Sequence, residues 1–102
     1  MPLQFFTEAV RIGQSLVTSG RLQAQPGVFP EDIVTLYAVV QGSEMTRGLM
    51  QMTSDQWSDT APAEGIGPGP ALAAGVTIIY RRGDRPAFET FTWSQEIEVR
   101  IQ

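Results

Sequence analysis

Arginine and carboxylate side chains carry most of the chemical capacity of this sequence. The chain has 102 residues with no Cys, His, Lys or Asn, and its seven basic residues are all arginines. These absences exclude thiolate nucleophiles, imidazole bases, Schiff-base lysines and zinc–sulfur sites. Carboxylate chemistry, cation binding through oxygen atoms and anion recognition by arginine remain.

Three of the arginines cluster at one predicted turn. Arg81, Arg82 and Arg85 could hold a phosphate or a partner carboxylate through paired hydrogen bonds. Arg82-Gly83-Asp84 is also the tripeptide that integrins read, but Gly and Asp are common in hairpin turns. We therefore predict a protein contact at this turn, and no integrin site.

The acidic residues form no recognisable site. One group lies in a polar stretch and another on predicted strands: Asp55, Asp59 and Glu64, and then Glu89, Glu96 and Glu98. The first group lacks the alternating acids and central glycine of a calcium loop. The second group could hydrolyse a glycoside only if two carboxylates converged in space, which the spacing does not indicate. We expect no catalytic residue, no metal and no cofactor.

A glycine-rich stretch resembles a phosphate-binding loop only superficially. Such loops follow a strand, precede a helix and donate several backbone N–H groups to the ligand. Here Gly65, Gly67 and Gly69 are interleaved with Pro68 and Pro70, which have no N–H to donate. The expectation is an extended linker.

Several apolar side chains could anchor a partner. Phe5 and Phe6 lie near the N-terminus and Trp57 lies in a loop-rich stretch, where aromatic side chains often form contacts. Trp93 lies on an alternating strand and is expected in the core. Three methionines could provide an adaptable surface but are expected mainly in the core: Met45, Met50 and Met52.

The clearest structural signal is a β-hairpin in the C-terminal third. Residues 76–80 are strand-like, residues 82–86 form a turn signal, and residues 87–93 alternate. Residues 96–102 continue with strict alternation of apolar and polar side chains, within a strand over residues 95–102. We expect this last strand at a sheet edge, where it could pair with another subunit.

Two earlier segments each permit two interpretations. Residues 3–19 show helical spacing and also alternate, and we favour a helix over a strand or extended arm. Residues 31–41 are rich in β-branched side chains and predict a strand, although Pro30-Glu31-Asp32 is typical of a helix start. Residues 44–53 fit either structure. A strand over 31–41 would have one wholly apolar face, made by Val34, Leu36, Ala38 and Val40.

The segments together predict one mainly β domain over residues 1–102. We expect an antiparallel sheet that forms a small sandwich or barrel, with an arm or one helix within residues 1–30. Residues 54–75 should form a long loop, because three prolines and three glycines fall between residues 61 and 70. An α+β fold is the alternative.

Two stretches loosely resemble phage single-strand annealing recombinases. Residues 9–22 (AVRIGQSLVTSGRL) are similar to the early helix of that family. Residues 79–86 through Phe91-Thr92-Trp93 are similar to one of its strand–turn segments. The resemblance covers about a quarter of the chain and implies a longer protein, a basic groove for DNA and ring-like oligomers.

Charge and composition favour a protein that works by fitting against other surfaces. The formal net charge of −4 does not favour binding to nucleic-acid backbones, and no apolar run is long enough to span a bilayer. The first residues lack a secretory signal, so we expect a virion or the cytoplasm of a host cell. The predicted contact residues are Phe5, Phe6, Trp57, Arg81, Arg82 and Arg85.

The expected function is that of a non-enzymatic structural or assembly protein. Such a protein would associate with itself or decorate a larger particle, and a small bacteriophage virion component (head decoration, neck or tail) is the specific expectation. The expected partners are further copies of the chain and a larger protein assembly, and not a membrane or nucleic acid. A single-strand nucleic-acid annealing module and a small acidic protein inhibitor are the alternatives.

Overall fold

Strands make up most of the computed structural model, which describes residues 8–22, 27–52 and 54–102. They are β1 Glu8–Ile12, β2 Ser15–Arg21, β3 Ile33–Gln41, β4 Glu44–Gln51, β5 Gln56–Pro62, β6 Gly69–Arg81 and β7 Ala87–Ile101. One 3₁₀ turn, η1 (Pro30–Asp32), precedes β3, and the described ranges contain no α-helix. Consequently, no helix in these ranges is long and apolar enough to cross a membrane. The prediction of a mainly β fold is confirmed.

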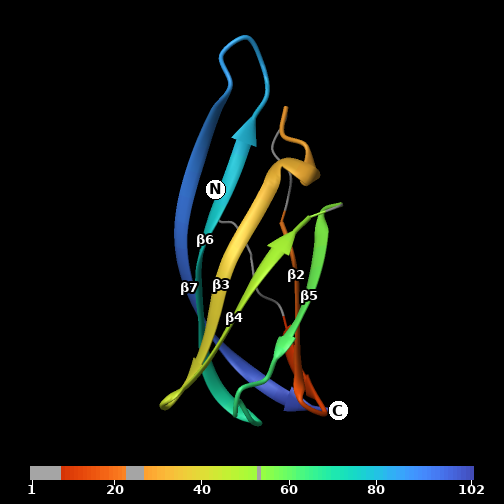
Figure 1. The fold of residues 1–102 in the computed structure, drawn as a ribbon, viewed down its shortest axis with the longest axis vertical. Helices are drawn as coiled ribbons and strands as arrows, with labels where there is room; N and C mark the ends of the chain where they lie inside the picture. Colours follow the sequence, from red (N-terminus) through yellow and green to blue (C-terminus); the bar gives the residue numbers. More distant parts are fainter. Residues whose placement is uncertain (1–7, 23–26, 53) are drawn as a thin grey trace.

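All seven strands belong to one sheet, in the order β4-β3-β6-β7-β1-β2-β5. Neighbouring strands are antiparallel except β1 and β7, which run parallel. The sheet curves until its edge strands β4 and β5 approach each other, so that it nearly closes into a barrel (Figure 1). The closure is incomplete: β4 and β5 remain the two ends of the strand order, and β7 pairs with β1 only from Val99 to Ile101.

The N-terminal described segment is a β-hairpin, so the helix favoured for residues 3–19 is wrong there. β1 and β2 pair from Glu8 opposite Ser19 to Ile12 opposite Ser15. Gly13, in the tight turn between them, has φ +61°, a conformation that favours glycine. The period of two decides the structure, because it buries alternate residues of β2 against the other strands. The similarity of residues 9–22 to a recombinase helix therefore does not hold.

β3 confirms the strand predicted over residues 31–41, and its beginning explains the helix signal. Pro30 opens a single 3₁₀ turn in which the Asp32 N–H donates to the Phe29 carbonyl at 2.9 Å. The chain becomes extended at Ile33, where β-branched side chains fit a pleated surface. Gly42-Ser43 then turns the chain into β4, which settles the segment that fitted either structure.

The long loop predicted over residues 54–75 is wrong for most of its length. β5 and the first part of β6 lie within it, and only residues 63–68 connect the two strands. The prolines are tolerated because they lie where strand pairing is incomplete: Pro62 ends an edge strand. Pro70 pairs with Glu98 on one side, whereas pairing with β3 on the other side begins only at Leu72.

The β6–β7 hairpin confirms the strongest sequence signal. It pairs from Gly69 opposite Val99 to Arg81 opposite Ala87. The expectation that the last strand lies at a sheet edge is wrong for residues 99–101, which lie between β6 and β1, whereas the pairs formed by residues 87–98 are with β6. Val99 pairs with Gly69 on one side and with Ala9 on the other. The C-terminal end of β7 therefore lies in the interior of the sheet and offers no free edge where it pairs with β1.

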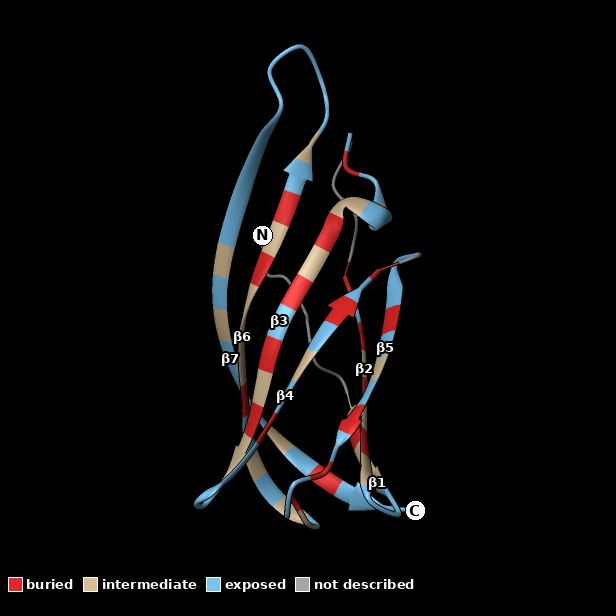
Figure 2. Cartoon of the chain, viewed as in Figure 1, coloured by how far each residue is buried: buried red, intermediate tan, exposed pale blue. Residues whose placement is uncertain are grey.

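Inward-facing side chains of alternating positions fill the barrel, and Figure 2 shows the resulting bands of buried residues along β3 and β4. The Thr35 and Thr77 hydroxyls lie 2.8 Å apart inside it, so one donates a hydrogen bond to the other. The largest fully buried side chains are Leu16, Leu22, Ile33, Met50, Ile66, Ile79, Val39, Val99, Thr18 and Thr77. The remaining positions of the same strands point outward.

Candidate contact surface

The outer side of β3 and β6 carries two adjacent rows of apolar side chains. The strand register places Leu36 beside Val76, and the same pairing continues along both strands. None of these side chains is fully buried by another part of the chain. The eight positions, here called the outer apolar face, are Val34, Leu36, Ala38 and Val40 of β3 and Leu72, Ala74, Val76 and Ile78 of β6.

β4 and β7 form the two borders of the outer apolar face. On β4, Met45 and Leu49 extend the apolar surface, and Arg47 lies between them beside Ala38. On β7 the outward positions beside the eight residues are polar, from Thr90 beside Ile78 to Glu96 beside Leu72. The face therefore has an apolar centre, a cation on one border and an anion on the other.

The exposure of this face is substantial for aliphatic side chains. Leu36 is 47% exposed, Leu49 53% and Leu72 43%. Single exposed apolar residues are ordinary on protein surfaces, whereas a contiguous patch across several strands is often functional. The arrangement can bury a second apolar surface.

The outer apolar face continues onto an arm formed by the end of the β6–β7 hairpin. β3 pairs with β6 only as far as Ile79, which lies opposite Glu89, so residues 80–88 extend beyond the other strands (Figure 1). Tyr80 and Phe88 are paired across this arm and are 43% and 68% exposed. Their positions follow the outward alternation of Ile78, so the apolar surface continues along the hairpin.

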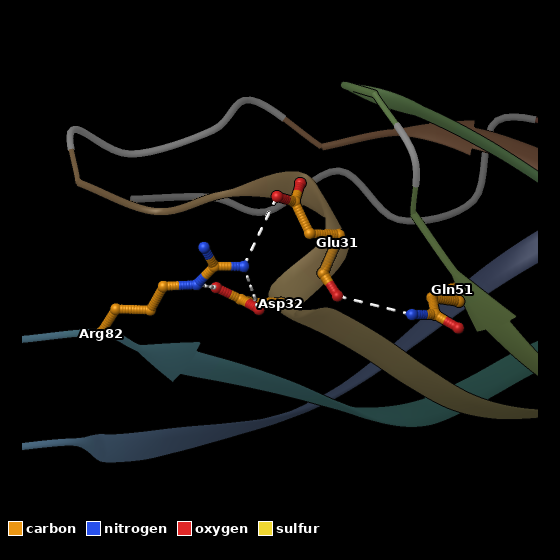
Figure 3. A network of polar contacts seen from close by, with 4 residues as sticks. All are labelled: Glu31, Asp32, Gln51 and Arg82. Carbon is orange, nitrogen blue, oxygen red and sulfur yellow. Dashed lines mark hydrogen bonds and ion pairs between the residues drawn. The ribbon is translucent and has the colours of Figure 1, made fainter.

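A polar cluster ties the arm to the 3₁₀ turn (Figure 3). Arg82 makes paired contacts with Asp32, Nε to Oδ2 at 2.6 Å and Nη2 to Oδ1 at 3.1 Å. Its Nη2 also lies 3.5 Å from Glu31 Oε1, and its guanidinium lies 4.4 Å from the centre of the Phe29 ring. The hydrogen bond with Asp32 raises the pKa of Arg82. The guanidinium of Arg82 is thus bound by carboxylates of its own chain.

The predicted arginine cluster does not form one anion site. Arg81 pairs with Glu89 across the hairpin at 2.6 Å, whereas Arg82 turns toward η1. Arg85 and Asp84 are exposed at the turn. The two paired guanidinium groups are neutralised by different carboxylates, so a shared phosphate would have to displace both.

The predicted aromatic contacts have separate outcomes. Phe5 and Phe6 lie outside the described residues. Trp57 is 6% exposed and belongs to the core, so the structure places it inside the barrel and not on a contact surface. Trp93 packs against Gly75, where an added Cβ would lie 2.8 Å from the indole ring. Trp93 thus takes the core role expected for it.

The acidic and methionine candidates mainly make contacts within the fold. Asp59 accepts a hydrogen bond of 2.7 Å from the Tyr37 hydroxyl. No group of three or more acidic, His or Cys residues in the described parts of the chain could hold a metal. Met50 and Met52 are buried as expected, but Met45 is 45% exposed beside the outer apolar face.

The glycine-rich connection uses its backbone polar groups internally. The Gln41 amide donates to the Gly67 carbonyl at 2.9 Å, and the Gly67 N–H donates back at 2.8 Å. Arg11 Nη1 donates to the Ile66 carbonyl at 2.7 Å, and the Ile66 side chain is fully buried. These hydrogen bonds hold the connection between β5 and β6 against the barrel.

A shallow groove of about 690 Å³ lies beside the lower end of the outer apolar face. Val40 and Leu72 contribute to its apolar lining, and among the described residues that line it the charged ones are Glu96 and Glu98. A cationic side chain with an apolar stem would fit this composition.

Comparison with known proteins adds no relative: no family model matches the chain, and no curated protein or solved structure is significantly similar to it. The site must therefore be interpreted from its own geometry.

Sequence reasoning found half of the outer apolar face. It identified the apolar side of β3 but assigned residues 69–75 to a loop, and so missed Leu72 and Ala74 of β6. The signal was present, because every second residue from Leu72 to Ile78 is apolar. The intervening positions are also small or β-branched, which hides the alternation.

Proposed function

We propose that this protein is a non-enzymatic structural subunit that works by self-association or by decorating a larger particle. Its contact surface is the outer apolar face. A small bacteriophage virion component, such as a head-decoration, neck or tail protein, is the specific form of this proposal.

One observation carries the proposal: eight apolar side chains lie outward in register on two adjacent strands, and none of them is fully buried. Such a surface gains free energy when water leaves it. A monomer would gain nothing from keeping an apolar outer side on a sheet whose inner side already forms the core.

The chemistry of the chain supports a role without turnover. The sequence lacks the thiol, imidazole and amine groups that most nucleophilic and acid–base mechanisms use. Two arginines of the hairpin, Arg81 and Arg82, pair with carboxylates of the same chain. Neither feature interferes with surface packing.

Light scattering over a dilution series tests the proposal. We expect the wild-type chain to exceed the 11.2 kDa mass of a monomer at micromolar concentration. Leu36→Glu should shift the association midpoint at least tenfold, because it places a carboxylate in the centre of the face. Circular dichroism should show an unchanged fold, since Leu36 is 47% exposed.

Ile101→Glu is the matched control. Ile101 is an exposed aliphatic residue at 62%, but it lies on the part of β7 that pairs with β1. Its substitution should leave association unchanged. Equal association of the Leu36→Glu and wild-type chains would reject the outer apolar face as the contact surface.

A further inference from the structure

We propose that the outer apolar face binds the same face of a second copy, with β4 of each copy lying over β7 of the other. The two copies would be related by a two-fold axis parallel to the strands. This inference rests on the proposed function and adds to it the identity and orientation of the partner.

The positions of the charges select this orientation. Arg47, Ala38, Ala74 and Ser94 form one row across the four strands, and Met45, Val40, Leu72 and Glu96 form the next. A two-fold axis parallel to the strands exchanges the borders and keeps the rows. Arg47 of one copy then lies over Ser94 of the other, about 7 Å along the strand from Glu96. An arginine side chain can reach across that distance.

The opposite orientation has no such pairing. A two-fold axis perpendicular to the strands would place β4 over β4 of the second copy. The outward positions there are Met45, Arg47, Leu49 and Gln51, none of which is acidic. Arg47 would face an apolar group, another arginine or the neutral Gln51, none of which supplies a carboxylate for the guanidinium.

The shallow groove supplies a place for the arriving guanidinium. Glu96 and Glu98 line it together with Leu72. The aliphatic stem of Arg47 would pack on the apolar lining while its head group binds a carboxylate. By two-fold symmetry, the same contact forms twice in one dimer.

The available area suits a weak dimer. Laid flat, four strands about 4.8 Å apart and four rows about 6.8 Å apart give roughly 500 Å² on each copy, and the curvature of the barrel wall lowers the area in contact. The total, up to roughly 1,000 Å², lies in the range of weak or transient protein interfaces.

Complementary charge reversals test the inference. Arg47→Glu and Glu96→Arg each create two like-charge contacts in a homodimer, so each variant alone should dimerise at least tenfold more weakly by sedimentation equilibrium at low salt. A mixture of the two variants forms heterodimers in which both pairs are opposite in charge. The mixture should therefore dimerise about as strongly as the wild type. Both residues are exposed, so the variants should fold normally.

The outcomes separate the two proposals. Arg85→Glu changes an exposed arginine outside the face and should leave the dimer unchanged. If the single reversals dimerise like the wild type, or if mixing does not restore dimerisation, the orientation is wrong. The outer apolar face would still be the contact surface if Leu36→Glu prevents that association. A wild-type chain that remains monomeric at all accessible concentrations overturns the second copy as partner.

Discussion

At the scale of single residues, Tyr37 of β3 reaches past the edge strand β4 to contact the other edge strand, β5. It pairs with Gly48 on β4 and with Gly75 on β6, and its hydroxyl donates to Asp59 on β5 at 2.7 Å. An added Cβ on Gly48 would overlap both the tyrosine ring and the Asp59 carboxylate. The absence of a side chain at Gly48 thus allows Tyr37 to reach across the opening between β4 and β5. Thr46 adds a second link by donating to the Pro62 carbonyl.

Substitution of this tyrosine gives a stability prediction with a defined pH dependence. Tyr37→Phe should lower the free energy of unfolding by about 1.5–3 kcal/mol near pH 7, because a hydrogen bond to a charged acceptor is lost. Burial, together with the hydrogen bond to Asp59 and its charge, raises the pKa of Tyr37 above the ordinary value of 10.0. Urea unfolding of both chains between pH 7 and 11 checks both effects.

The sign of the pH effect follows from proton linkage. Above pH 10 the unfolded chain releases the tyrosine proton while the folded chain retains it, so wild-type stability falls as pH rises. The difference between wild type and Tyr37→Phe should therefore shrink by about 1.4 kcal/mol per pH unit above pH 10. A difference that is constant or grows with pH would contradict this account of Tyr37.

Gln41 has a comparable role at the scale of the elements, because it fastens the connection between β5 and β6. Its amide exchanges two hydrogen bonds with Gly67 and makes a third, of 3.3 Å, to the Pro70 carbonyl. The side chain thus imitates a further pair of strand hydrogen bonds at the end of β3. It holds in place a loop that has no strand partner of its own.

Gln41→Ala should loosen this connection. We expect a loss of about 1–2 kcal/mol in the free energy of unfolding, since two well-formed hydrogen bonds disappear. Amide hydrogen exchange at Gly67 should accelerate by at least tenfold. Gln51→Ala is the control, because Gln51 makes a single contact of 3.5 Å with the Glu31 carbonyl. Equal exchange at Gly67 in both variants would show that Gln41 does not hold the loop.

The elements that the sequence predicts well are those fixed by local pattern. Residues 76–93 alternate around a turn signal, and residues 33–41 are dense in β-branched side chains, so each segment specifies its own structure. The N-terminal hairpin was less predictable because residues 9–16 satisfy both periods. The turn at Gly13 resolves the ambiguity only when its positive φ is known.

Features that depend on distant neighbours could not be predicted from local pattern. Whether Pro70 can lie in a strand depends on where β3 begins to pair with β6. The internal position of β7 depends on its parallel pairing with β1, which lies at the other end of the chain. The outer apolar face likewise exists only because β3 and β6 are neighbours, and they are separated in sequence by β4 and β5.

At the scale of the whole molecule, the chain has an apolar core inside the barrel and the outer apolar face on one side of its surface. The body measures 46 × 21 × 20 Å, and the outer apolar face runs along its length toward the arm. Its opposite charges lie on opposite borders, at Arg47 and Glu96. This asymmetry is what makes the face complementary to itself after a two-fold rotation.

The protection of a single thiol measures burial of this face directly. The natural chain has no cysteine, so Leu36→Cys and Ile101→Cys each carry one reactive group. Both native side chains are exposed, at 47% and 62%. A soluble maleimide should modify Leu36→Cys at least tenfold more slowly at high protein concentration than at high dilution, and Ile101→Cys at the same rate throughout. Association with no change in the rate at Leu36→Cys would contradict the central claim that copies of this protein meet through the outer apolar face.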